Sequence, residues 1–273
     1  MGGGRDGAGD PREVLSRTAP APTTTVRYGE GPDHVADVWL PDAAVASASL
    51  PLVVVIHGGF WRAGYGRSVA APMSVALRDD GYAVAAVEYR RTGVGGGWPA
   101  TAEDVRAAVE TVPRLLGDRA PGPTVLVGHS AGGHLALWAA SQAAVPRLAG
   151  VVSLGGVCDL VRADQLALDR DGDDGAVATL LGGRSADVPE RYAAADPMQL
   201  PPPRVPVVLV HGVEDRIVPV ELSRRYAAYA RAAGAAVRLV ELPGIEHFGP
   251  VDPLSPAWSA VRTSVAGLVA AAS

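Results

Sequence analysis

The chain has 273 residues, a formal net charge of −5 and a pI of about 5.7. Hydrophobic residues make up 48% and charged residues 19%, which is typical of a globular protein and not of a disordered one. The acidic balance argues against nucleic acid or an anionic membrane as a partner. No stretch approaches the roughly 20 apolar residues of a membrane span, and the N-terminus opens no apolar signal region.

Residues 1–24 are rich in Gly, Pro, Thr and charge, and we expect a flexible lead-in there. The rest of the chain, 25–273, is expected to form a single domain. Its first strand, 35–40, alternates in polarity and ends at Pro41, which is typical of an antiparallel strand near a sheet edge.

Six short, Val-rich and apolar runs then alternate with helix-like stretches. Strands with this pattern are covered on both faces, so the sequence predicts an α/β fold with a mostly parallel, doubly wound sheet and helices on both faces. The strands are expected at 52–57, 83–88, 124–129, 151–154, 207–211 and 237–241, and the helices near 67–80, 100–116, 133–144, 220–233 and 255–271.

One stretch, 159–204, interrupts this alternation between two strands. Long excursions in compact domains often act as lids, and we expect a small cap-like insertion that controls substrate size. Its acidic run 169–175 resembles a calcium loop but lacks the closing Glu at the required spacing, so a solvated loop is favoured and no metal is expected.

The most informative motif is Gly128-His129-Ser130-Ala131-Gly132-Gly133. It follows an apolar run and precedes a helix-like stretch, as a nucleophile elbow does. Gly128 and Gly132 lack a Cβ, so the strand and the helix can approach closely around Ser130. The alternative is a serine that only caps a helix; the motifs downstream favour a nucleophile.

A serine nucleophile needs a base and an orienting carboxylate, in the chain order Ser, Asp or Glu, His. Asp215 lies in the loop after the strand at 207–211, with Glu214 beside it as a competitor, and His247 follows the last strand. Loops at the carboxyl edge of an open sheet carry its site. We therefore expect Ser130, Asp215 and His247 to form a catalytic triad.

The run His57-Gly58-Gly59-Phe60-Trp61 follows the strand at 52–57. Its glycines can turn backbone N–H groups toward a developing oxyanion. We expect the oxyanion hole to use amides from Gly58, Gly59 and Phe60, joined by the N–H of Ala131.

These motifs resemble the α/β-hydrolase superfamily, and within it the esterase and kynurenine-formamidase-like group. The resemblance covers roughly residues 35–270 and implies an α/β-hydrolase fold, acyl-enzyme chemistry and no cofactor. It rests on His57-Gly58-Gly59-Phe60-Trp61, Glu88-Tyr89-Arg90-Arg91, Gly97-Trp98-Pro99-Ala100, the elbow, the 211–219 run and the stretch around His247.

Two tryptophans are candidates for the substrate pocket, Trp61 beside the oxyanion loop and Trp98 after a glycine run, although large aromatics are more often core. Among the other histidines, His57 is expected to brace the oxyanion loop, and His129 and His134 to pack or hydrogen-bond locally. Cys158 carries no nucleophile motif and is expected to be an inert thiol.

The sequence thus predicts a serine hydrolase that cleaves carboxylic esters of small or aromatic acids. The alternative is an arylformamidase acting on an N-formylkynurenine-type amide; a peptidase and a silent ligand-binding relative are weaker alternatives. The expected partner is a small ester or formamide, and a homodimer is compatible with the sequence. With no signal region, no membrane span and no pair of cysteines, we expect a cytoplasmic location.

Overall fold

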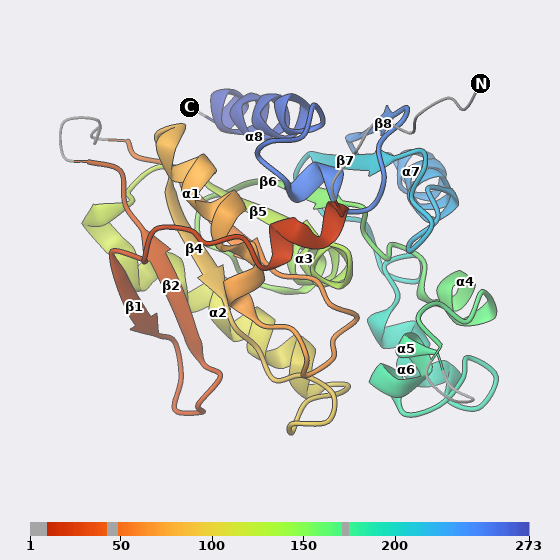
Figure 1. The fold of residues 1–273 in the computed structure, drawn as a ribbon. Coiled ribbons are helices and arrows are strands. Elements are labelled where there is room, and N and C mark those ends of the chain that lie inside the picture. The colour runs from red at the N-terminus through yellow and green to blue at the C-terminus, as the bar shows by residue number, and fades with distance from the viewer. Residues whose placement is uncertain (1–9, 43–48, 171–174, 273) are drawn as a thin grey trace.

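The computed structural model describes residues 10–42, 49–170 and 175–272. Eight strands form one sheet in the order β1-β2-β4-β3-β5-β6-β7-β8 (Figure 1). All pairs from β4 to β8 are parallel, whereas β1 and β2 are antiparallel to their neighbours. The strands are β1 (Thr24–Arg27), β2 (Val35–Trp39), β3 (Leu52–Ile56), β4 (Ala83–Val87), β5 (Thr124–His129), β6 (Leu148–Leu154), β7 (Val207–Gly212) and β8 (Val237–Leu242).

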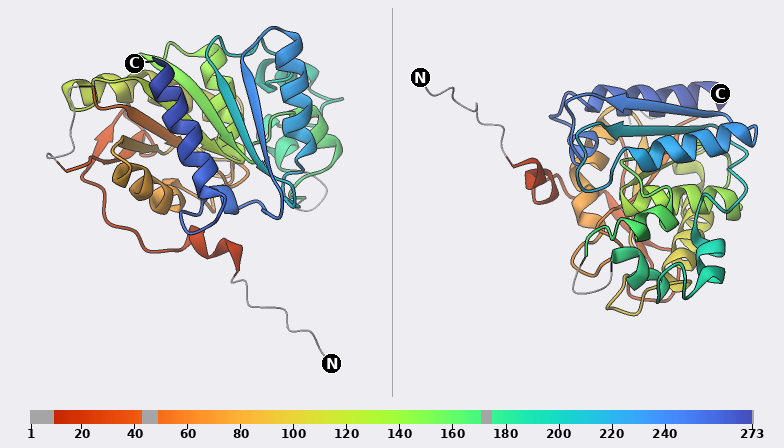
Figure 2. Two further views of the ribbon diagram at one scale, coloured as in Figure 1. Left: turned by 90° about the horizontal axis from the view of Figure 1, so that it is seen from above. Right: turned by 90° about the vertical axis from the view of Figure 1, so that its right-hand side faces the viewer.

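Helices cover both faces of this sheet (Figure 2). In β3, Leu52, Val54 and Ile56 contribute to a core shared with α2 (Ala100–Leu116), α3 (Ala131–Gln142) and α7 (Glu221–Ala232). The alternate residues Val53 and Val55 face the opposite way, toward α1 (Ala71–Asp79) and α8 (Trp258–Ala272). This alternation explains why the central strands are apolar throughout, and it confirms the predicted doubly wound sheet.

The last strand differs from this pattern. β8 was expected to be covered on both faces, but its side chains are only partly buried or exposed. The reason is its place at the end of the sheet, where it has a neighbour on one side only.

The insertion between β6 and β7 contains three short helices, α4 (Leu160–Gln165), α5 (Ala176–Leu181) and α6 (Pro189–Ala195). It is tied to α3, because Trp138 Nε1 donates to the carbonyl oxygen of Ala194 at 3.0 Å. Of the acidic run 169–175, residues 171–174 lie outside the described residues.

The N-terminal region differs from the expected flexible lead-in. A 3₁₀ helix, η1 (Pro11–Leu15), packs against η2 (Arg67–Ala70), and Val14 is only 1% exposed. Residues 1–9 lie outside the described residues. Two further 3₁₀ turns are η3 (Gly117–Arg119) and η4 (Gly249–Val251).

Candidate active site

Ser130 occupies a sharp turn between β5 and α3, with φ +54° and ψ −118°. That backbone conformation is strained for a residue with a Cβ. The turn is compact because two glycines leave no room for a side chain: a Cβ on Gly128 would lie 2.1 Å from the Gly132 carbonyl oxygen, and one on Gly132 would lie 2.0 Å from that of Ile56. The geometry of a nucleophile elbow is therefore present.

Asp215 and His247 meet across the ends of two strands. His247 Nδ1 lies 2.6 Å from Asp215 Oδ2, and the backbone N–H groups of Ile217 and Val218 donate to Oδ1 at 2.9 and 2.8 Å. An ionised carboxylate only accepts, so Nδ1 of His247 donates to Asp215, and Nε2 is the nitrogen left to accept a proton. Glu214, the competitor, is exposed.

Burial alone would raise the pKa of Asp215. Hydrogen bonds from His211 and His247, together with the charge of His247, outweigh burial and hold the pKa well below its ordinary value. Asp215 is therefore a permanent anion at neutral pH, as the partner of a histidine that gains and loses a proton must be.

A second histidine on Asp215 was missed by the sequence analysis. His211 Nε2 lies 3.2 Å from Asp215 Oδ2 and 2.8 Å from the Val218 carbonyl oxygen, and Nδ1 lies 2.7 Å from Ser223 Oγ. The signal was its place at the end of β7, four residues before Asp215. His211 therefore restrains the same carboxylate oxygen, Oδ2, that His247 contacts.

His129 and His134 pack locally, as expected. His129 Nε2 lies 3.2 Å from the carbonyl oxygen of His247, and His134 Nε2 lies 3.0 Å from that of Ala195. Burial, with the charge of His247 second, lowers the pKa of His129 to about 3, and burial lowers that of His134 to about 4. With pKa values this low, neither ring can hold a proton taken from Ser130 at pH 7, whereas His247 is paired with the Asp215 carboxylate, so His247 is the candidate general base.

The predicted oxyanion loop lies directly beside Ser130. A Cβ on Gly58 would approach the Ser130 Cβ to 3.0 Å, and Gly59, at φ +109°, lies beneath the ring of Tyr65. Phe60 also has a positive φ, +49°, so consecutive peptides turn sharply here. Ala131 is the first residue of α3, and a helix leaves the N–H of that residue without a helical partner.

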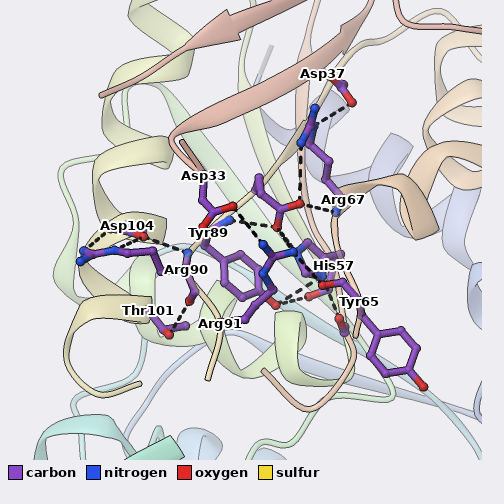
Figure 3. Close-up of polar contacts among 12 residues, drawn as sticks. Asp33, Asp37, His57, Tyr65, Arg67, Tyr89, Arg90, Arg91, Thr101 and Asp104 are labelled. Carbon is purple, nitrogen blue, oxygen red and sulfur yellow. Dashed lines mark hydrogen bonds and ion pairs between the residues drawn. The ribbon is translucent and has the colours of Figure 1, made fainter. Parts of the chain in front are cut away.

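An ionic cluster around His57 and Tyr89 supports this loop (Figure 3). His57 Nδ1 lies 2.8 Å from the Gly58 carbonyl oxygen, and Nε2 lies 2.9 Å from Glu88 Oε1. Tyr89 stacks on the His57 ring at 4.3 Å. The Gly58 carbonyl and the Gly59 N–H belong to one planar peptide, so a hydrogen bond to the carbonyl also fixes the direction of the N–H.

Glu88 in turn is held by two arginines. Arg67 donates its backbone N–H to Glu88 Oε2 at 3.0 Å, and Arg91 Nη1 lies 3.2 Å from Glu88 Oε1. Burial would raise the pKa of Glu88, but the hydrogen bonds from His57 and Arg67 and the charges of His57 and Arg91 lower it below its ordinary value. The expectation that His57 braces the loop fits this arrangement.

Ser130 and His247 line one cavity of about 270 Å³. Its wall combines the oxyanion loop with aromatic, apolar and charged side chains: Arg12, Leu15, Gly58, Gly59, Phe60, Tyr65, Val69, His129, Ser130, Asp169, Ile217, His247 and Phe248. The volume suits a small acyl group. Arg12 and Leu15 come from η1, which the sequence analysis had assigned to the lead-in.

Neither tryptophan expected in the pocket lies on its wall. Trp61 is fully buried and packs edge-to-face on His134, with ring centroids 5.4 Å apart. Trp98 packs edge-to-face on Trp138 at 5.6 Å. The φ of +57° at Trp61 turns its backbone after the oxyanion loop, and its side chain belongs to the core.

In the described residues, no three His, Cys, Asp or Glu side chains are grouped so that they could hold a metal ion. Burial raises the pKa of Cys158 to about 12, so its thiol stays protonated.

No helix in the described ranges is long and apolar enough to span a membrane.

The model of the BD-FAE family matches residues 36–229. The chain belongs to the BD-FAE family. Esterase LipQ of Mycobacterium tuberculosis is 28% identical to this BD-FAE chain over 83% of the chain and 57% of LipQ. A kynurenine formamidase of Salmo salar is 26% identical over 84% of the chain and 76% of the formamidase.

Solved structures share the fold of this BD-FAE protein. A truncated carbohydrate esterase from gut microbiota has a TM-score of 0.76 at 20% identity, covering 92% of this chain and all of that one. Esterase B of Lactobacillus rhamnosis also has a TM-score of 0.76 at 20% identity, and the match covers 96% of this chain and 90% of esterase B. These likenesses establish the α/β-hydrolase fold. The chain spans little more than half the length of curated esterases such as LipQ and LipM.

Proposed function

We propose that the protein is a serine hydrolase that cleaves carboxylic esters through an acyl-enzyme intermediate. The observation that carries the proposal is the 2.6 Å bond between His247 and Asp215, with His247 and the strained Ser130 on the wall of one cavity. Relatives named as esterases, LipQ and LipC among them, support this reading.

In the proposed mechanism, Ser130 Oγ attacks the ester carbonyl carbon while His247 Nε2 takes its proton. Asp215 stabilises the imidazolium that results. The tetrahedral oxyanion accepts hydrogen bonds from the N–H groups of Gly59 and Ala131, with Gly58 or Phe60 as a further donor. His247 then returns the proton to the leaving alcohol.

The second half of the reaction repeats these roles with water. His247 removes a proton from a water molecule, which attacks the acyl carbon, and then returns the proton to Ser130 as the acid departs. The atoms balance without a cofactor. The cavity of about 270 Å³ favours short or compact acyl groups.

An arylformamidase is the second candidate, because a kynurenine formamidase is matched over most of its length. Paired initial rates on 4-nitrophenyl acetate and N-formylkynurenine distinguish the two, with Ser130→Ala as the control. We expect the ester to have the higher kcat/KM. A strong preference for the formamide would favour the arylformamidase over the esterase. Full activity in Ser130→Ala would refute both, since both use Ser130 as the nucleophile. A cytoplasmic location stays a prediction.

A further inference from the structure

The N-terminal helical turn forms part of the wall of the candidate active site. Arg12 and Leu15 of η1 line the cavity that also contains Ser130 and His247. These residues precede the first strand, yet they contact the same space as the oxyanion loop. The segment is therefore placed to contact a substrate.

Several contacts fix η1 in this position. Val14 is buried in the core cluster that includes Met73 and Leu77. Arg17 forms a two-pronged pair with Asp252, in which Nη2 donates to Oδ2 at 2.9 Å. Asp10 caps η1 by accepting the backbone N–H of Arg12 at 2.9 Å. Arg12 is thus presented from a docked element.

The charge balance of the cavity singles out Arg12. Among the described residues of its wall, Asp169 is the one acidic side chain, and it is already paired, because Arg62 Nε lies 3.1 Å from its Oδ2. Arg12 is exposed, and within the described ranges no carboxylate lies at ion-pairing distance from its guanidinium. The Asp10 carboxylate is engaged by the backbone and not by the guanidinium of Arg12.

We infer that Arg12 recognises a carboxylate on the substrate, so that the preferred esters are anionic. The inference rests on the proposed esterase function and names its substrate class. A guanidinium matches a carboxylate with two parallel hydrogen bonds. Phe60, Tyr65 and Phe248 supply the apolar and aromatic wall for the rest of such a substrate.

Matched ester pairs test this inference. Mono(4-nitrophenyl) succinate and 4-nitrophenyl butyrate have four-carbon acyl groups and differ in a terminal carboxylate. A second pair, 4-acetoxybenzoate and phenyl acetate, places the carboxylate in the leaving group. For each pair, the ratio of kcat/KM for the anionic ester to that for the neutral ester is measured in wild type, Arg12→Gln and Arg12→Lys.

We expect Arg12→Gln to lower this ratio up to about fivefold in at least one pair, mainly through KM, since a charge-assisted hydrogen bond at an exposed site is lost. Arg12→Lys should restore part of the ratio, and added salt should lower it in wild type. Arg106→Gln, an exposed arginine on α2 away from the cavity wall, should leave the ratio unchanged.

A ratio unchanged by Arg12→Gln in both pairs would overturn the inference. Ser130→Ala separates this failure from failure of the proposed function. If the Ser130→Ala variant is inactive on all four esters, and the anionic-to-neutral ratio of kcat/KM is the same in wild type and Arg12→Gln, only the anionic preference is refuted. If the Ser130→Ala variant stays active, the esterase mechanism itself is refuted.

Discussion

Replacing Glu88 by Gln should both destabilise the protein and impair the oxyanion loop. Glu88 is 5% exposed and accepts hydrogen bonds from His57, from the backbone N–H of Arg67 and from that of Tyr89. Breaking a buried ion pair by removing one partner costs about 3–5 kcal/mol. We expect a loss of that order in the free energy of unfolding at pH 7, measured by equilibrium unfolding in guanidinium chloride.

The effect of Glu88→Gln on the free energy of unfolding should depend on pH. The pKa of Glu88 is lower in the folded protein than its ordinary value of 4.5. The stability that its charge contributes is therefore fully present above the unfolded pKa and is lost as pH falls through the folded pKa. The difference in unfolding free energy between wild type and Glu88→Gln should accordingly shrink on acidification below about pH 4.

The kcat of Glu88→Gln tests whether Glu88 also positions the oxyanion loop. His57 is held by Glu88 and holds the Gly58 carbonyl, so the Gly59 N–H should lose its fixed direction in Glu88→Gln. Loss of one oxyanion donor costs about 10²–10³ in turnover, and we expect kcat of the folded variant to fall by tenfold or more. Glu103→Gln, an exposed acid on α2, is the matched control. A Glu88→Gln protein within 1 kcal/mol of wild type, with unchanged kcat, would refute the reasoning.

Three further changes give distinct outcomes. Asp215→Asn should lower kcat by about 10⁴, because the amide can no longer hold the required tautomer of its partner ring; a loss below tenfold in steady-state assays would contradict the proposed role. Gly132→Ala should unfold or strongly destabilise the protein, since its Cβ would lie 2.0 Å from a backbone oxygen, whereas Gly267→Ala on α8, with open space around it, should be neutral or stabilising by up to about 1 kcal/mol in thermal unfolding. Val14→Ala should cost about 1–3 kcal/mol; an unchanged unfolding midpoint would show that η1 is not docked.

Much of the fold followed from local patterns. Runs of Val in 52–57 and 124–129 predicted central strands because both sheet faces are covered there. β1 was missed, since Thr24–Arg27 is a short edge strand whose side chains alternate between partly buried and exposed. η1 was missed because its docking depends on the single buried side chain of Val14 and on a distant partner, Asp252, neither of which leaves a periodic pattern.

The candidate site divides in the same way. The chain order of Ser130, Asp215 and His247 and the position of each after a strand are sequence properties, and parallel strands bring such loops to one edge. The pairing of His211 with Asp215 depends on the three-dimensional path of the loop after β7. The burial of Trp61 depends on a backbone turn with φ +57°, which no propensity of Trp would suggest.

The most direct test of the account is covalent labelling by a fluorophosphonate, followed by peptide mass spectrometry. Such probes react with a serine hydroxyl that has been activated as a nucleophile. We expect a single adduct on Ser130, absent in Ser130→Ala and formed much more slowly in Asp215→Asn. An unlabelled folded wild-type protein, or an adduct that persists in Ser130→Ala, would contradict it.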